Sequence, residues 1–106
     1  VVSNKFYTAT QELCKHFFGD LIPVAIGERE DIRKKPAPDT VDEAFKQLGV
    51  SRENAVYVGD SDVDVATAKN SNLPCISVLW GFRDKDFLIK HGATTFVNTT
   101  QELLAI

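Results

Sequence analysis

The chain has 106 residues, a formal net charge of −3 at pH 7 and an apolar content of 43%. These values predict one domain, or part of one, with a core of ordinary size. They argue against a nucleic-acid-binding surface, which is normally basic, and no apolar run approaches the length of a membrane span.

The first half of the chain predicts two strands and two helices in alternation. In chain order these elements cover residues 1–5, about 8–18, 23–27 and 38–48. Thr8 and Gln11 have the spacing of a capping box at the start of the first helix. Gly19 and Gly49 mark the ends of the two helices, where a left-handed residue is common.

The second half continues the same alternation. Strands are predicted over residues 56–59, 74–79 and 95–97, with helices over about 62–71, 85–91 and from 100 onward. Asn72 and Gly92 occupy helix-end positions, and Thr99 with Glu102 forms a second capping-box pattern. Strands that alternate with helices favour a three-layer, Rossmann-like α/β/α fold with a mainly parallel sheet.

The turn after residues 56–58 carries the densest group of acidic residues. The apolar run predicts a buried strand, which turns at Gly59 and is followed by Asp60, Asp62 and Asp64. Asp60 and Asp64 are four residues apart and fall on one face, which suits Mg²⁺, a cation usually held by one or two carboxylates. Acidic residues are also common at helix starts for electrostatic reasons alone, and that alternative stays open.

The two cysteines, Cys14 and Cys75, fall in helix-like and strand-like segments. They are expected to be small buried side chains rather than a disulfide. This pattern favours a reducing, cytoplasmic location.

Three short motifs in order resemble the core of the haloacid dehalogenase-like hydrolase superfamily, in particular its phosphoglycolate phosphatase-type members. The strand that ends at Ser3 resembles motif II, and Lys35 followed by Pro-Ala-Pro resembles motif III. The segment Gly59–Asp64 resembles motif IV. The segment Trp80–Phe82 also resembles phosphoglycolate phosphatase sequences.

The resemblance implies a Mg²⁺-dependent phosphatase in which an aspartate attacks a phosphate monoester. In that role Ser3 donates its hydroxyl to the phosphate, beside the backbone N–H of Asn4. Lys35 places its ammonium group against the phosphate. Asp60 binds Mg²⁺ directly, and Asp64 acts through water or by orienting the other ligands.

Each of these residues also has an ordinary structural interpretation. Ser3 is a residue type common at strand ends, and Lys35 follows Arg33 and Lys34 in an exposed basic run. Asp62 points away from the metal in this scheme and is expected to be solvated. Lys5 is a weaker candidate for substrate contact.

The family's first motif, a strand ending in Asp-x-Asp that carries the nucleophile, is not found in the sequence. Residues 1–106 are therefore expected to be the C-terminal portion of a hydrolase core, without the first strand and the cap. In the family that strand lies between the strands of motifs II and IV. We expect another segment or chain to fill the gap, the two strands to pair across it, or a preceding segment to exist.

The leading hypothesis is hydrolysis of a small phosphorylated metabolite similar to phosphoglycolate, with the isolated chain inactive. Alternatives are another phosphatase or a sugar-phosphate mutase of the same superfamily, or a non-catalytic Rossmann-like binding module. No nucleic-acid or membrane partner is expected.

Overall fold

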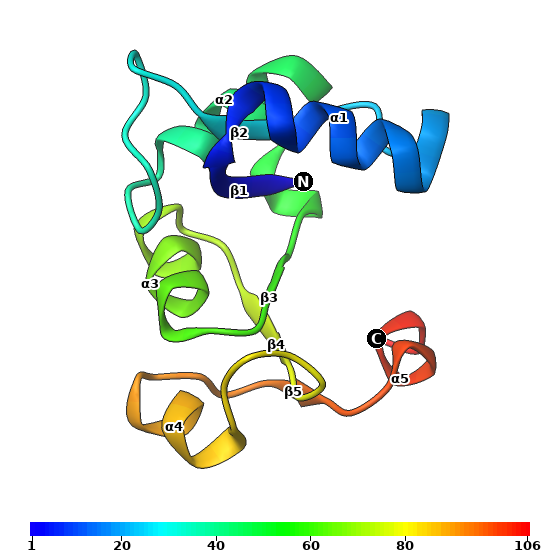
Figure 1. Cartoon of the computed structure of the whole chain (residues 1–106). Helices are drawn as coiled ribbons and strands as arrows, with labels where there is room; N and C mark the ends of the chain where they lie inside the picture. Colours follow the sequence, from blue (N-terminus) through cyan, green and yellow to red (C-terminus); the bar gives the residue numbers. More distant parts are fainter. The chain divides into compact units, whose positions relative to one another are not determined.

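A computed structural model describes residues 1–106, and these residues form two compact units, Val1–Glu53 and Asn54–Ile106. Both units combine parallel strands with helices (Figure 1). The predicted α/β class with a parallel sheet is therefore confirmed.

The first unit consists of two strands and two main helices, with a short 3₁₀ turn at each of two connections. These elements are β1 (Val2–Phe6), α1 (Tyr7–Phe18), η1 (Gly19–Leu21), β2 (Ile26–Glu28) and α2 (Asp39–Leu48), and the turn η2 (Arg52–Asn54) spans the sequence boundary between the two units. Strands β1 and β2 pair in parallel, with Val2 opposite Ile26. Ile26 is fully buried, and Cys14 and Val41 are buried with it on the hydrophobic side of this unit.

The ends of α1 show which local signals the chain uses. The predicted capping box at Thr8 is wrong, because α1 begins at Tyr7 directly after β1 and its N-cap Phe6 makes no side-chain bond. Thr8 is thus already inside the helix. The predicted end at Gly19 is confirmed, with a positive φ of 56°, and Gly49 ends α2 in the left-handed conformation with φ of 66°.

The second unit is a three-stranded parallel sheet with three helices. Its elements are β3 (Tyr57–Gly59), α3 (Asp62–Asn70), β4 (Cys75–Val78), α4 (Lys85–Lys90), β5 (Phe96–Val97) and α5 (Thr100–Leu104). The strand order is β3-β4-β5. Ile76, Val78 and Val97 form the buried cluster of the sheet, and Leu103 packs against it.

Local signals in the second unit are largely confirmed. Asn72 has φ of 57°, as expected of a residue just past a helix end. The Thr99 hydroxyl accepts a hydrogen bond from the Glu102 backbone N–H at 3.2 Å, and the Glu102 carboxylate accepts one from the backbone of Asn98 at 2.6 Å. The capping box therefore forms, with its return bond shifted by one residue. Both cysteines are free; Cys14 is buried as expected, whereas Cys75 is only partly buried.

The strands form two separate sheets, β1-β2 and β3-β4-β5. Of the three outcomes expected at the position of the missing strand, direct pairing of the strands of motifs II and IV is therefore not the one found. The apolar run before the acidic turn predicts a buried strand, but Val58 in β3 is 43% exposed and Val56, just before β3, is 53% exposed. Tyr57 points to α3, so its two neighbours point to the opposite side of β3, an edge strand.

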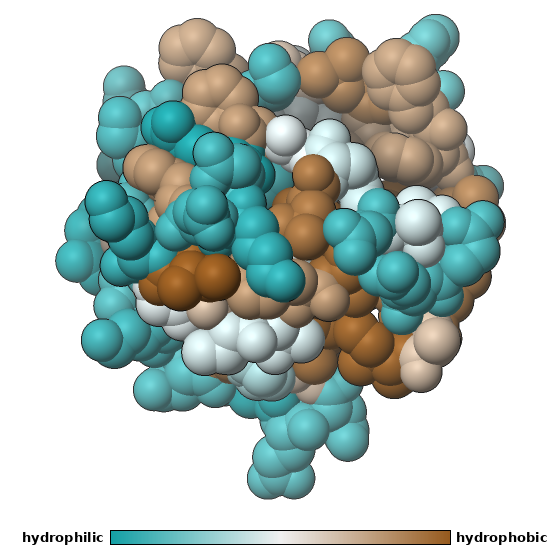
Figure 2. Space-filling view, turned by 90° about the horizontal axis from the view of Figure 1, so that it is seen from below, coloured by the Kyte–Doolittle hydropathy of each residue, from teal (hydrophilic) through white to brown (hydrophobic).

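Apolar side chains reach the surface in both units, including Phe17 in α1 and Phe82 after β4. Figure 2 shows one face, on which brown apolar patches lie between teal polar ones. None of the helices combines the length and the apolar character needed to cross a bilayer.

Candidate functional site

The turn between β3 and α3 is built around the carboxylate of Asp64. This side chain is only 6% exposed and accepts hydrogen bonds from the Tyr57 hydroxyl at 2.8 Å, the Asp60 backbone N–H at 3.0 Å and the Ser61 hydroxyl at 3.1 Å. A buried charge needs such partners, because its desolvation is otherwise costly. The three bonds join the strand, the turn and the helix into one rigid corner.

Two further features support this corner. The Ser61 hydroxyl caps α3 by accepting a hydrogen bond from the backbone N–H of Asp64 at 3.3 Å. Gly59 lies so close to Asp64 that a Cβ at residue 59 would come within 2.3 Å of the Asp64 Cβ. Glycine is therefore required here by close contact between the strand end and the acid.

Asp60 is partly buried at the end of β3, and its carboxylate makes one described hydrogen bond. Its Oδ2 accepts from the Phe82 backbone N–H at 3.1 Å, and its backbone carbonyl accepts from Arg83 N–H at 3.3 Å. Across residues 1–106, no group of three or more Asp, Glu, His or Cys side chains lies close enough to hold a metal. One carboxylate with water, supported by a second, is a donor set that fits Mg²⁺.

Asp62, expected to be solvated, has a partner in the second unit. Its side chain is 33% exposed, and its Oδ1 lies 3.9 Å from Arg83 Nε. Asp62 is thus partly solvated, and it also pairs with Arg83 in the segment after β4.

The first unit brings the Ser3 and Lys35 segments together through Asn4. The Asn4 side chain donates from Nδ2 to the Lys35 carbonyl at 3.2 Å, and its Oδ1 accepts from the Lys35 N–H at 2.8 Å. The Ser3 hydroxyl accepts a hydrogen bond from the Lys5 N–H at 3.1 Å. The motif points only to the backbone of Asn4, whereas the Asn4 side chain holds the Lys35 backbone in place.

Arg33, which precedes Lys35 in the basic run, is committed to a different partner. Its guanidinium lies 2.8 Å from the Asp39 carboxylate at the start of α2, and its backbone N–H donates to the same carboxylate at 2.9 Å. These hydrogen bonds to Arg33 hold the pKa of Asp39 below its usual value, and they raise the pKa of Arg33. Arg33 is thus held by Asp39, whereas the backbone of Lys35 is held by Asn4. Lys35 is also less exposed than Arg33 or Lys34.

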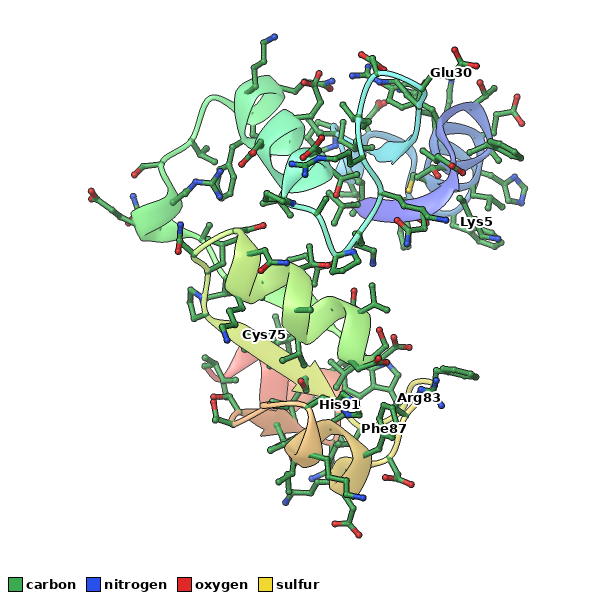
Figure 3. The ribbon with its side chains drawn as sticks, turned by 90° about the vertical axis from the view of Figure 1, so that its left-hand side faces the viewer. Lys5, Glu30, Cys75, Arg83, Phe87 and His91 are labelled. Carbon is green, nitrogen blue, oxygen red and sulfur yellow. The ribbon has the colours of Figure 1, made fainter.

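The two histidines take no part in either group. His91 follows α4, and its Nδ1 lies 2.9 Å from the Phe87 carbonyl, with its ring against the Phe87 ring. Figure 3 labels His91 and Phe87 near one another, together with Arg83. His16 packs on Phe17 in α1. Lys5, the weaker candidate, is exposed.

Comparison with known proteins defines the class. The sequence profile of haloacid dehalogenase-like hydrolases matches residues 1–78, which is most of the chain. The chain therefore belongs to the haloacid dehalogenase-like hydrolase family.

Individual relatives narrow the comparison. The phosphoglycolate phosphatase of Rhodobacter capsulatus is 33% identical over 84 residues, which is 78% of this chain and 37% of that protein. A protein of Caldanaerobacter subterraneus subsp. tengcongensis that is provisionally named pyrophosphatase PpaX is 32% identical over 95 residues, 90% of this chain and 41% of that protein. The chain thus spans about two fifths of the length of these relatives.

Solved structures have the same fold. A protein of Lactobacillus delbrueckii subsp. bulgaricus, provisionally named phosphoglycolate phosphatase, matches 97% of this chain and 43% of its own with a TM-score of 0.94 and 50% identity. CbbY of Rhodobacter sphaeroides, solved as a mutant with xylulose-(1,5)bisphosphate, matches 94% of this chain and 45% of its own with a TM-score of 0.72 and 28% identity. The predicted core fold is confirmed by this agreement.

Replacing Tyr57 with phenylalanine is predicted to change how stability depends on pH. Burial and the nearby Asp64 charge raise the pKa of Tyr57 above its ordinary value of 10.0. As pH rises above 10, the unfolded chain therefore loses this proton while the folded chain keeps it, and stability falls. Tyr57→Phe should lower the unfolding free energy at pH 7 by about 1.5–3 kcal/mol and remove the Tyr57 part of the alkaline loss.

Urea unfolding between pH 7 and 11 measures both effects, and Tyr7→Phe in the first unit is the matched control. An equal alkaline loss in Tyr57→Phe and the native chain would contradict the assignment.

Replacing Asn4 with alanine is predicted to loosen the Lys35 backbone. The substitution removes both described hydrogen bonds between the Asn4 side chain and Lys35, each worth about 1 kcal/mol. Hydrogen exchange followed by NMR should show faster exchange of the Lys35 amide, with the Asp64 amide unchanged. Asn98→Ala, a change in the second unit, should leave the Lys35 amide at its native rate. Unchanged exchange in Asn4→Ala would show that another group holds Lys35.

Proposed function

We propose that this chain supplies the phosphate-binding and metal-binding groups of a Mg²⁺-dependent phosphatase that acts on a small phosphate monoester. The observation that carries the proposal is the pair of hydrogen bonds between the Asn4 side chain and the Lys35 backbone. These bonds tie together the two segments that resemble the phosphate-binding motifs of the family. Membership of the haloacid dehalogenase-like hydrolase family also supports this proposal.

In the proposed site, Ser3 and Lys35 bind the phosphate. The Ser3 hydroxyl and the Asn4 backbone N–H donate to phosphoryl oxygens, and the Lys35 ammonium neutralises the charge that these oxygens carry. Donors that are fixed before the reaction stabilise the transition state without reorganisation. The clamp of Asn4 on the Lys35 backbone and the pairing of Arg33 with Asp39 supply that fixation.

Asp60 and Asp64 have different roles in binding the metal. Asp60 holds the ion through its carboxylate, which makes a single described hydrogen bond, to the Phe82 N–H. Asp64 already accepts three hydrogen bonds, so it orients the Asp60 backbone and the turn instead of serving as the main ligand. When bound, Mg²⁺ neutralises charge on the transferring phosphoryl group.

The attacking group in this proposal is an aspartate outside residues 1–106. Attack of its carboxylate oxygen on phosphorus breaks the bond to the ester oxygen and gives an aspartyl-phosphate, which water then hydrolyses. The three acids at the β3–α3 turn have other partners: Asp64 accepts hydrogen bonds, Asp62 pairs with Arg83, and Asp60 accepts from the Phe82 N–H and is assigned here to the metal. The proposed domain assignment, the C-terminal portion of a hydrolase core, follows from the same argument.

Phosphoglycolate is the first substrate to test, because two of the similar proteins carry that name. Pyrophosphate is the second, because of the similarity to a protein named pyrophosphatase. The bisphosphate bound by CbbY keeps a sugar-phosphate reaction among the alternatives. A cytoplasmic location is part of the proposal, since the two free cysteines suit a reducing compartment.

A chimera tests the proposed function. This chain would replace the matching region of the 50%-identical Lactobacillus protein, which supplies the remaining sequence. The chimera is expected to hydrolyse phosphoglycolate with Mg²⁺, and Lys35→Ala or Asp60→Asn should each lower kcat/KM by about 10²–10³.

Lys34→Ala, the neighbouring exposed lysine, is the matched control and should retain full activity. The 106-residue chain alone should show no turnover above a Lys35→Ala background. Turnover by the isolated chain, or a chimera indifferent to Lys35→Ala, would overturn the proposal.

A further inference from the structure

The segment that follows β4, Trp80–Arg83, packs directly on Asp60. It reaches Asp60 from 22 residues further along the chain, through the hydrogen bond from Phe82 N–H to the Asp60 carboxylate at 3.1 Å. A second bond runs from the Arg83 N–H to the Asp60 carbonyl at 3.3 Å. Both the side chain and the backbone of Asp60 are therefore held by one short segment.

Gly81 makes this contact sterically feasible. A Cβ at residue 81 would lie 2.3 Å from both the Cβ and the Oδ2 of Asp60, a distance that real atoms do not tolerate. Rotation of the Asp60 side chain does not relieve the clash, because the position of its Cβ is fixed by the backbone. Gly81 does not adopt a left-handed φ, so contact with Asp60, and not backbone conformation, requires glycine here.

Arg83 holds the same segment from its other end. Its guanidinium carbon lies 4.5 Å from the ring centroids of both Phe82 and Phe87, and its Nε lies 3.9 Å from Asp62. Figure 3 shows Arg83 and Phe87 close to each other. Stacking on two rings and an ion pair to α3 limit the freedom of the loop above Asp60.

We propose that the loop Trp80–Arg83 positions the Asp60 carboxylate for the metal, with Gly81 as the positioning residue. The loop occupies Oδ2 through the Phe82 N–H and so fixes the rotation of the carboxylate group. Groups that orient a metal ligand typically contribute about 10–100-fold to metal affinity. The inference rests on the proposed function, because it takes Asp60 as the metal ligand.

The test uses the ¹⁵N-labelled 106-residue chain and a titration with MgCl₂ followed by amide NMR. In the native chain the Phe82 and Asp60 amides should shift on Mg²⁺ addition, and Asp60→Asn should abolish these shifts. Gly81→Ala should weaken Mg²⁺ binding by about 10-fold or more. It should also move the Phe82 amide resonance before any metal is added, because the hydrogen bond to Asp60 is broken.

Gly27→Ala is the matched control for loss of stability. A Cβ there meets the Lys5 carbonyl, the Thr10 hydroxyl and the Tyr7 Cα at 2.6 Å, all within the first unit. This variant should melt at a lower temperature and still bind Mg²⁺ with native affinity. An effect of Gly81→Ala that merely reflected lower stability would appear in Gly27→Ala as well, and that result would overturn the inference.

The outcomes separate the two proposals. Native Mg²⁺ affinity in Gly81→Ala, with binding lost in Asp60→Asn, would reject the loop's role and leave the metal assignment intact. Mg²⁺ shifts that persist in Asp60→Asn, or that are absent from the native chain, would reject the metal assignment and the inference with it.

If Gly81→Ala does not fold, Asp60→Ala measured without metal decides the point. Its Phe82 amide should shift and exchange faster, and an unchanged Phe82 amide would overturn the inference.

Discussion

The hydrogen bonds to the buried carboxylate of Asp64 are the interactions on which the second unit's candidate site depends. It is 6% exposed and accepts hydrogen bonds from a strand residue, a turn backbone N–H and the helix-capping serine. Burial of an ionised carboxylate costs free energy unless hydrogen bonds compensate for the lost water, so the burial of Asp64 depends on these three donors. Because the Asp60 backbone N–H is one of the three donors, these hydrogen bonds also fix the orientation of the Asp60 backbone, which matters for function.

In the first unit a candidate-site residue is also held in place, but by an uncharged side chain. There a neutral amide, Asn4, uses both its donor and its acceptor on the backbone of Lys35, 31 residues away. Such a bond constrains the chain without requiring the Lys35 ammonium group itself. Because the backbone of Lys35 is held in place and its side chain is long, its ammonium group suits a role as a point charge toward an anion.

Much of the fold could be predicted from the sequence, because many signals are local. Gly19, Gly49 and Asn72 adopt the positive φ angles that their positions suggested, and Thr99 caps α5. The same capping pattern fails at Thr8, since β1 continues to Phe6 and leaves no loop in which a cap could sit. The exposure of Val58 was also missed, because an apolar run does not reveal which side of an edge strand is covered.

The candidate residues were found by their motifs, but their supporting contacts were not. The hydrogen bond from the Lys35 N–H to Asn4 spans 31 residues and that from the Phe82 N–H to Asp60 spans 22, so no local pattern contains them. Gly81 had a visible signal, a glycine between two aromatic residues after a strand, yet its contact with Asp60 follows only from the three-dimensional fold. Tyr57 was likewise read as a strand residue, whereas it donates to the buried acid.

The central proposal is that Ser3 and Lys35 bind the phosphate and that Asp60 binds the metal. A crystal structure of the chimera with Mg²⁺ and orthovanadate, a mimic of the transferring phosphoryl group, tests it most directly. The account predicts that the Lys35 ammonium and the Ser3 hydroxyl contact the vanadate while the Asp60 carboxylate ligates the Mg²⁺ beside it. Vanadate bound without Lys35, or Mg²⁺ bound away from Asp60, would contradict it.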